Sequence, residues 1–209
     1  MRKILIAFLL ANFILLWTGC EKDSEYSIST MIDSRDGEVY TIVTIRNQTW
    51  MAENLRYDTP GSWENPRNPS PIYGRLYDWD TAMIACPSGW HLPSDSEWNN
   101  LEIALGLDVN LIEEEDRGFH AKSMKSVEGW EGNENGNNLS MFNVYPAGVI
   151  SYGMSFFRFG NGAYIWTATI APNPGGARVA WCRGFSYGDK VARGTGLPTN
   201  GFSCRCVKD

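Results

Sequence analysis

Five cysteines and two histidines are the side chains of this sequence with the most obvious capacity for chemistry. Cys86 opens the segment CPSGWHLPSDSEW, which also contains His91, and Cys204 and Cys206 form a C-x-C pair near the C-terminus. A thiol beside an imidazole can act as a nucleophile. However, nothing else in the sequence gives His91 a catalytic partner, and neither a G-x-S-x-G motif nor a phosphate-binding loop is present. A structural corner is therefore the favoured interpretation, and no catalytic residue is assigned.

The sequence also assigns no metal ligands. A zinc site needs converging His, Cys or carboxylate side chains, and His91 and His120 stand at unrelated positions. The loop EGNENGNN offers oxygens from Asn133, Asn135 and Asn137, which Ca²⁺ can accept. Because the loop lacks the D-x-D-x-D spacing, a solvated loop is favoured over a structural Ca²⁺ site, and no other cofactor is expected.

Three aromatic residues in turn-rich segments could stack against a ligand: Trp63, Tyr73 and Tyr152. Aromatic side chains more often pack against their own loop than against a ligand. Packing is therefore the favoured role of all three, and together with the three asparagines they are the candidate ligand-binding residues.

The surrounding sequence predicts short strands and two helices. Ser94 and Glu97 form an S-x-x-E capping box at the start of a helix over residues 95–105, which Gly106 ends. A shorter helix over residues 76–85 stops at Cys86 and Pro87. Alternating apolar residues predict a hairpin of 38–45 with 49–55, followed by strands over 142–150, 154–160, 163–170, 177–185 and 202–208. The expected class is α+β with small antiparallel sheets and long loops.

The N-terminus has the features of a targeting signal. Arg2 and Lys3 precede an apolar run over residues 4–17, which is too short for a membrane span but suits a signal peptide. LWTGC resembles the bacterial lipobox, so residues 1–19 are expected to be a lipoprotein signal and Cys20 the lipidated N-terminus. Residues 20–35 are expected to be a polar tether. Its lysine followed by acids resembles surface-export signals of Bacteroidetes lipoproteins, which implies an outer-membrane protein facing the exterior.

Charge and cysteine content agree with an exported protein. Removal of Arg2 and Lys3 takes the formal net charge from −6 to −8, which argues against a nucleic-acid partner. With Cys20 lipidated, four cysteines remain, an even number that predicts two disulfides with three connectivities. Cys204 and Cys206 point to the same face if their segment is a strand, so they are not expected to bond to each other.

Five motifs in order resemble the Fibrobacter succinogenes major paralogous domain over residues 36–209. They are DGEVYTIVTIRNQTWMAENL, GRLYDWDTAMIACPSGWHLPSDSEW, FNVYPAG, IWTAT and GFSCRCVKD. That family in turn looks similar to the formylglycine-generating-enzyme (sulfatase-modifying-factor) and C-type-lectin-like folds, which implies two short helices flanking small twisted sheets. Arg46 replaces the family's usual glycine at the hairpin turn, a position expected to need positive φ.

The resemblance also implies a disulfide pairing. The family commonly has only the cysteines that match Cys86 and Cys206, so these two are expected to bond, with an additional Cys182–Cys204 disulfide. Formylglycine-generating enzymes hold copper with thiols spaced C-x-x-x-x-C, whereas this chain has C-x-C. The calcium and sugar motifs of C-type lectins are not present on strands either, so neither site is carried over.

The leading functional hypothesis is a lipid-anchored, surface-exposed, non-enzymatic module that binds a glycan or a partner protein. One alternative is an enzyme with a formylglycine-generating-like thiol and copper site. Another is a structural component of a cell-surface assembly.

The lipid anchor gives a direct prediction. Changing Cys20 to Ala removes the acylated sulfur, so the protein is expected to move from the membrane fraction to the soluble fraction, as measured by fractionation and immunoblotting. The Cys182→Ala variant is the control and should stay with the membranes. Retention of the Cys20→Ala variant would contradict lipidation.

Overall fold

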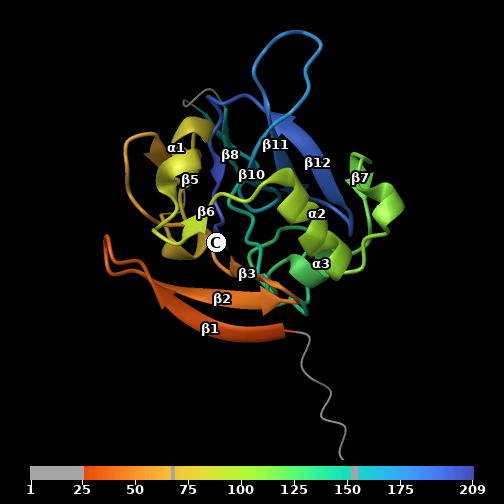
Figure 1. Cartoon of the computed structure of the whole chain (residues 1–209), viewed down its shortest axis with the longest axis horizontal. Coiled ribbons are helices and arrows are strands. Elements are labelled where there is room, and N and C mark those ends of the chain that lie inside the picture. Colours follow the sequence, from red (N-terminus) through yellow and green to blue (C-terminus); the bar gives the residue numbers. More distant parts are fainter. Residues whose placement is uncertain (1–25, 67–68, 152–154) are drawn as a thin grey trace, which may run out of the picture.

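The computed structural model describes residues 26–66, 69–151 and 155–209 (Figure 1). Cys20, the expected signal peptide and Tyr152 lie outside the described residues. Within them the chain is α+β, as predicted, with three α-helices and mostly antiparallel sheets. The helices are α1 (Trp79–Ala85), α2 (Asp95–Ala104) and α3 (Ala121–Met124), and the 3₁₀ turns are η1 (Pro71–Tyr73) and η2 (Val109–Leu111). The sequence predicted two helices, and the four-residue α3 was missed.

The first sheet has five strands in the order β1-β2-β3-β14-β6, all antiparallel. They are β1 (Tyr26–Ile32), β2 (Val39–Ile45), β3 (Gln48–Met51), β14 (Val207–Lys208) and β6 (Trp90–His91). In Figure 1, β1 and β2 form one side of the molecule, and the C-terminus lies near its centre. The tether expected over residues 20–35 is wrong for residues 26–32, because β1 pairs with β2 along its whole length.

The second sheet has seven strands in the order β4-β5-β13-β10-β11-β12-β7. They are β4 (Ser62–Trp63), β5 (Leu76–Tyr77), β13 (Phe202–Ser203), β10 (Ala163–Ile170), β11 (Ala180–Phe185), β12 (Val191–Gly196) and β7 (Asp116–Arg117). Only β10 and β13 run parallel. A separate hairpin joins β8 (Val149–Ser151) to β9 (Ser155–Phe157). The predicted strand over 163–170 is confirmed, whereas 142–150 and 202–208 contain only short strand pieces.

The structure confirms two local predictions, the capping box of α2 and the positive φ at the β2–β3 turn. The Ser94 hydroxyl accepts a hydrogen bond from the Glu97 backbone N–H, and the Glu97 carboxylate accepts one from the Ser94 backbone N–H, which completes the capping box of α2. Arg46 has φ 52° in the two-residue turn between β2 and β3, so the predicted positive φ is confirmed.

Tryptophans fill the core between the first sheet and α2. Trp50 of β3 and Trp98 of α2 are fully buried and meet edge to face, with ring centroids 5.0 Å apart. Phe142 contacts both rings in the same manner. Edge-to-face aromatic pairs add to the stabilisation that burial supplies.

The other face of α2 is held to the second sheet by buried charges. Asp95, Asn99 and Glu102 recur at helical spacing along this face. The Glu102 carboxylate is fully buried and accepts hydrogen bonds of 2.6 Å from both Arg117 Nη2 and Arg183 Nε. Burial alone would raise the pKa of Glu102, but His120, Arg183 and Arg117 outweigh it and lower the pKa to about 2.

Asp95 and Asn99 complete this ionic cluster. Asp95 accepts from Arg183 Nη1 at 2.7 Å and from Arg193 Nη2 at 2.8 Å. The Asn99 Oδ1 atom accepts from Arg117 and Arg183. Because every charge has a partner, the desolvation cost of burying the ions is offset. The cluster was not predicted from the sequence.

Acid should weaken this cluster. Since the pKa of Glu102 is lowered on folding, its contribution to the free energy of unfolding is present above about pH 4.5 and is lost as the pH falls towards 2, a loss of about 3 kcal/mol. Glu102→Gln should therefore destabilise the protein by about 3–5 kcal/mol at pH 7, because it leaves buried arginines unpaired. Denaturant unfolding followed from pH 7 to 2 measures both effects.

The control for this prediction is Glu113→Gln. Glu113 pairs with Arg193 but its side chain is 75% exposed, so its loss should cost at most about 1 kcal/mol. The difference between wild type and Glu102→Gln should shrink below pH 4.5. A difference that stays constant to pH 2 would contradict the role of the Glu102 charge.

Candidate functional site

A surface cavity of about 620 Å³ opens between the β8–β9 hairpin and the outer face of the second sheet. Four aromatic side chains line it: Phe157, Tyr164, Tyr187 and Phe202. Polar groups come from residues that include Arg158 and Asn161. A concave surface with several aromatic rings and a few polar groups is the usual form of a small-ligand site.

The floor of the cavity is built by cross-strand packing. Tyr164 on β10 pairs with Gly184 on β11, and a Cβ atom at position 184 would lie 3.5 Å from the Tyr164 ring. Phe202 packs against Tyr164, with centroids 5.4 Å apart, and stacks on the buried Trp166 at 4.1 Å. The tyrosine ring therefore lies over β11 at van der Waals distance from position 184, and its contact with Phe202 joins it to the core.

The rim of the cavity remains open to solvent. Phe157 is 51% exposed and Tyr187 is 64% exposed, which makes their rings accessible to a ligand. Arg158 follows β9 with φ 57° and lies close enough to Tyr164 to influence its titration. Burial raises the pKa of Tyr164, and the Arg158 charge opposes that rise.

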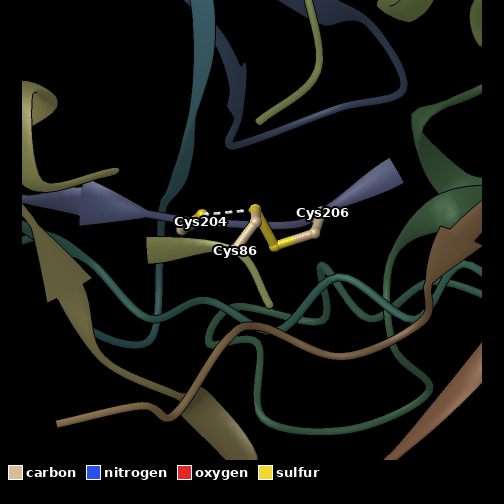
Figure 2. A group of neighbouring side chains, drawn as sticks. All are labelled: Cys86, Cys204 and Cys206. Atoms are coloured by element: carbon tan, nitrogen blue, oxygen red, sulfur yellow. Dashed lines mark hydrogen bonds between the residues drawn. A yellow bond between two sulfur atoms is a disulfide. The ribbon is translucent and has the colours of Figure 1, made fainter. Parts of the chain in front are cut away.

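A cluster of three sulfur atoms lies in the core at the C-terminal end of α1 (Figure 2). Cys86, the C-cap of α1, is bonded to Cys206, with a Cα–Cα distance of 5.8 Å, so this predicted disulfide is confirmed. The Cys204 Sγ atom lies 3.9 Å from the Cys86 Sγ atom. All three sulfurs lie within 4.8 Å of one another, but the disulfide leaves only Cys204 as a thiol.

The predicted Cys182–Cys204 disulfide is wrong, because both residues are buried free thiols. Cys182 lies on β11 and Cys204 directly follows β13, and β10 runs between these two strands. Two strand spacings separate the backbones by about 10 Å, more than the 7 Å that a disulfide can bridge. Burial raises the pKa of each thiol to about 12, which keeps both protonated at neutral pH.

His91 has two carboxylate partners that the sequence did not reveal. Its Nε2 atom lies 2.8 Å from Glu97 Oε1 and its Nδ1 atom lies 2.6 Å from Asp209 Oδ1. Partial burial would lower the pKa of His91, but hydrogen bonds to Asp209 and Glu97 outweigh it and raise the pKa. The imidazole therefore links the first turn of α2 to Asp209.

The asparagine loop is held by its own amides and by a lysine. Asn135 Oδ1 accepts from the Trp130 backbone N–H and Asn137 Oδ1 from that of Leu139. Lys125 Nζ donates to the backbone oxygens of Ser186 at 2.5 Å and Gly188 at 3.0 Å, and it lies 3.4 Å from Glu134 Oε2. The Lys125 ammonium therefore contacts carbonyl and carboxylate oxygens of the kind that would ligate Ca²⁺.

Five of the six candidate ligand-binding residues lie in the described part of the chain, and the structure does not bring these five together. Asn133 and Asn135 line a separate cavity of about 310 Å³ beside Lys125. Trp63 and Tyr73 are half-buried against Leu76, Ala147 and Ile150, in agreement with the favoured packing role.

The residues that line the aromatic cavity were not predicted from the sequence to form a ligand-binding site. Phe157 and Arg158 lie in the segment MSFFRFG and Tyr187 follows β11, so each was assigned only to a strand or its end. The density of aromatic residues was visible in the sequence, but the strand order that collects them was not.

Within the described residues, the fold and these sites define an α+β domain with a core disulfide and an aromatic surface cavity. The chain belongs to the Fibrobacter succinogenes major domain family, whose family model matches residues 43–208. No curated protein and no solved structure matches the chain. Among the residues that the structure describes, no helix is both long and apolar enough to cross a membrane.

Removal of the disulfide should destabilise the domain. Cys86→Ser leaves Cys206 without its partner and frees the C-terminal segment from α1, which should lower the free energy of unfolding by about 2–5 kcal/mol. Denaturant unfolding without reductant measures the change. Cys182→Ala is the matched control, because Cys182 is buried but unbonded, and it should cost less. Equal losses in the two variants would contradict a stabilising role for the disulfide.

Proposed function

We propose that this chain is a lipid-anchored, surface-exposed, non-enzymatic binding module that holds a glycan in the aromatic cavity. The proposal includes a C-type-lectin-like or sulfatase-modifying-factor-like fold, a signal peptide over residues 1–19 and a lipidated Cys20 on the exterior face of the outer membrane. The observation that carries it is the cavity itself, with exposed rings at Phe157 and Tyr187 above a rigid floor.

The shape and chemistry of the cavity suit a sugar. Aromatic faces provide apolar contact for the C–H face of a sugar ring, while Asn161 and Arg158 offer amide and guanidinium donors for hydroxyl groups. Tyr164 and Phe202 are held by the core, so little conformational entropy is lost when a ligand binds.

The charge of the cavity favours an acidic glycan. Arg158 is exposed and, within the described part of the chain, forms no ion pair with a carboxylate, whereas most other arginines of the domain are paired. A guanidinium group binds carboxylate or sulfate groups with paired hydrogen bonds. Sugars that carry either group are therefore the proposed ligand class.

The enzyme alternative needs a pair of accessible thiols near the C-terminus. Cys206 is bonded to Cys86, and Cys204 is fully buried with its pKa raised to about 12 by burial. These observations favour a binding module over a thiol and copper enzyme.

A glycan array probed with the detergent-solubilised protein tests the proposal, with neutral and acidic glycans compared. Tyr187→Ala and Phe157→Ala should each weaken binding about ten-fold, which corresponds to about 1.4 kcal/mol. Arg158→Gln should remove the preference for acidic glycans. The control is Ile84→Ala, an 81% exposed apolar side chain on α1 outside the cavity, which should leave binding unchanged.

Two results would contradict the proposal. One is glycan binding that the cavity variants leave unchanged. The other is an array without any bound glycan while the protein copurifies in a fixed stoichiometric protein complex, which would support a protein partner or a structural role instead.

A further inference from the structure

The Cys86 sulfur has two neighbouring sulfur atoms, one bonded and one free. Figure 2 shows the Cys86 Sγ atom with the Cys206 sulfur bonded to it and the Cys204 sulfur facing it across a dashed line. The free contact is 3.9 Å, which is close to van der Waals distance for two sulfurs. Thiol–disulfide exchange needs a thiolate that approaches a disulfide sulfur along the S–S axis. Because all three sulfurs lie within 4.8 Å of one another, Cys204 contacts Cys86 from the side, and its side chain has to rotate before it can attack.

The C-x-C spacing produces this arrangement. Residues two apart on an extended chain point to the same side, so Cys204 and Cys206 both face Cys86, while Arg205 points away. The Arg205 guanidinium donates to Asn54 Oδ1 at 2.9 Å and to the backbone oxygens of Phe142 and Asn143. These contacts hold the backbone between the two cysteines, so that both sulfurs stay near the end of α1.

We infer that Cys204 is a reserve partner for Cys86, so that the three cysteines form a thiol–disulfide exchange site with two isomers, Cys86–Cys206 and Cys86–Cys204. This inference is independent of the proposed glycan binding, because neither its residues nor its chemistry involve the aromatic cavity.

The exchange step is balanced without an oxidant or a reductant. Cys204 loses its proton, and the thiolate attacks the Cys86 Sγ atom as the Cys86–Cys206 bond breaks. The Cys206 sulfur leaves as a thiolate and takes up a proton. One disulfide and one thiol are present before and after the step, and only the partner of Cys86 changes.

The surroundings explain why the Cys86–Cys206 isomer is the resident one. Cys204 is fully buried, and burial raises the pKa of its thiol to about 12. The charge of Arg35 opposes this rise, and Tyr77 is a neighbouring titratable group. Spontaneous attack is therefore slow. Cys86 is half-buried, whereas Cys204 and Cys206 are fully buried, so a small external thiol that speeds the exchange would enter at Cys86.

Peptide mapping distinguishes the isomers because trypsin cleaves after Arg205. Free thiols are blocked with a maleimide in denaturant, and the unreduced protein is digested, which places Cys204 and Cys206 on different peptides. In the full-chain Cys206→Ser variant, we expect the Cys86 peptide to be linked to the Cys204 peptide in nearly all molecules. In Cys204→Ser, the control, the Cys86–Cys206 link should remain.

A second measurement keeps the inference testable if Cys206→Ser fails to fold. Native wild-type protein is incubated with a small amount of glutathione at pH 8 and then mapped, and the Cys86–Cys204 linked peptide should appear while Cys182 stays alkylated. The inference is overturned if Cys86 and Cys204 are both alkylated in folded Cys206→Ser protein. It is equally overturned if glutathione yields only the Cys86–Cys206 link, or a link to Cys182.

Discussion

The Glu102 carboxylate forms the buried ion pairs that hold α2 against the second sheet. It lies fully buried between α2 and the second sheet and is hydrogen-bonded by Arg117 of β7 and Arg183 of β11. Since a buried charge is tolerated only with good partners, α2 has one rotation and one position at which Glu102 meets both arginines. That placement also sets Trp98, on another face of the helix, against Trp50 of the first sheet.

The C-terminal segment joins the parts that α2 separates. β13 pairs with β5 and β10 in the second sheet, and β14 pairs with β3 and β6 in the first. Between them, Cys206 is bonded to α1 at Cys86, and Arg205 binds the backbone at Phe142 and Asn143. This short C-terminal segment therefore connects both sheets, α1 and the loop that contains Phe142 and Asn143.

Packing in the core fixes the position of the aromatic rings that form the floor of the cavity. Tyr164 and Phe202 belong to strands of the second sheet, so the cavity floor is an extension of the core. Phe157 ends strand β9 of the separate hairpin, and Tyr187 lies in the connection between β11 and β12. A fixed floor with an exposed aromatic rim suits recognition of a ligand. The three cysteines belong to the core cluster that also contains Tyr164 and Phe202, but none of them lines the cavity.

Features that depend on neighbouring residues could be predicted from the sequence alone. The Ser94–Glu97 capping box, the hairpin with Arg46 at positive φ and the strand over 163–170 follow from short-range backbone geometry, and all three are confirmed. Motif order also identified the family and, through it, the Cys86–Cys206 pair. Contacts between residues far apart in the sequence became visible only in the folded chain. The insertion of β10 between β11 and β13 excludes a Cys182–Cys204 bond. The packing of the β8–β9 hairpin and of the β11–β12 connection beside β10 brings Phe157, Tyr187 and Tyr164 to one cavity. The same is true of the charges around Glu102, because periodicity marks the face of α2 but cannot say which arginines lie opposite it.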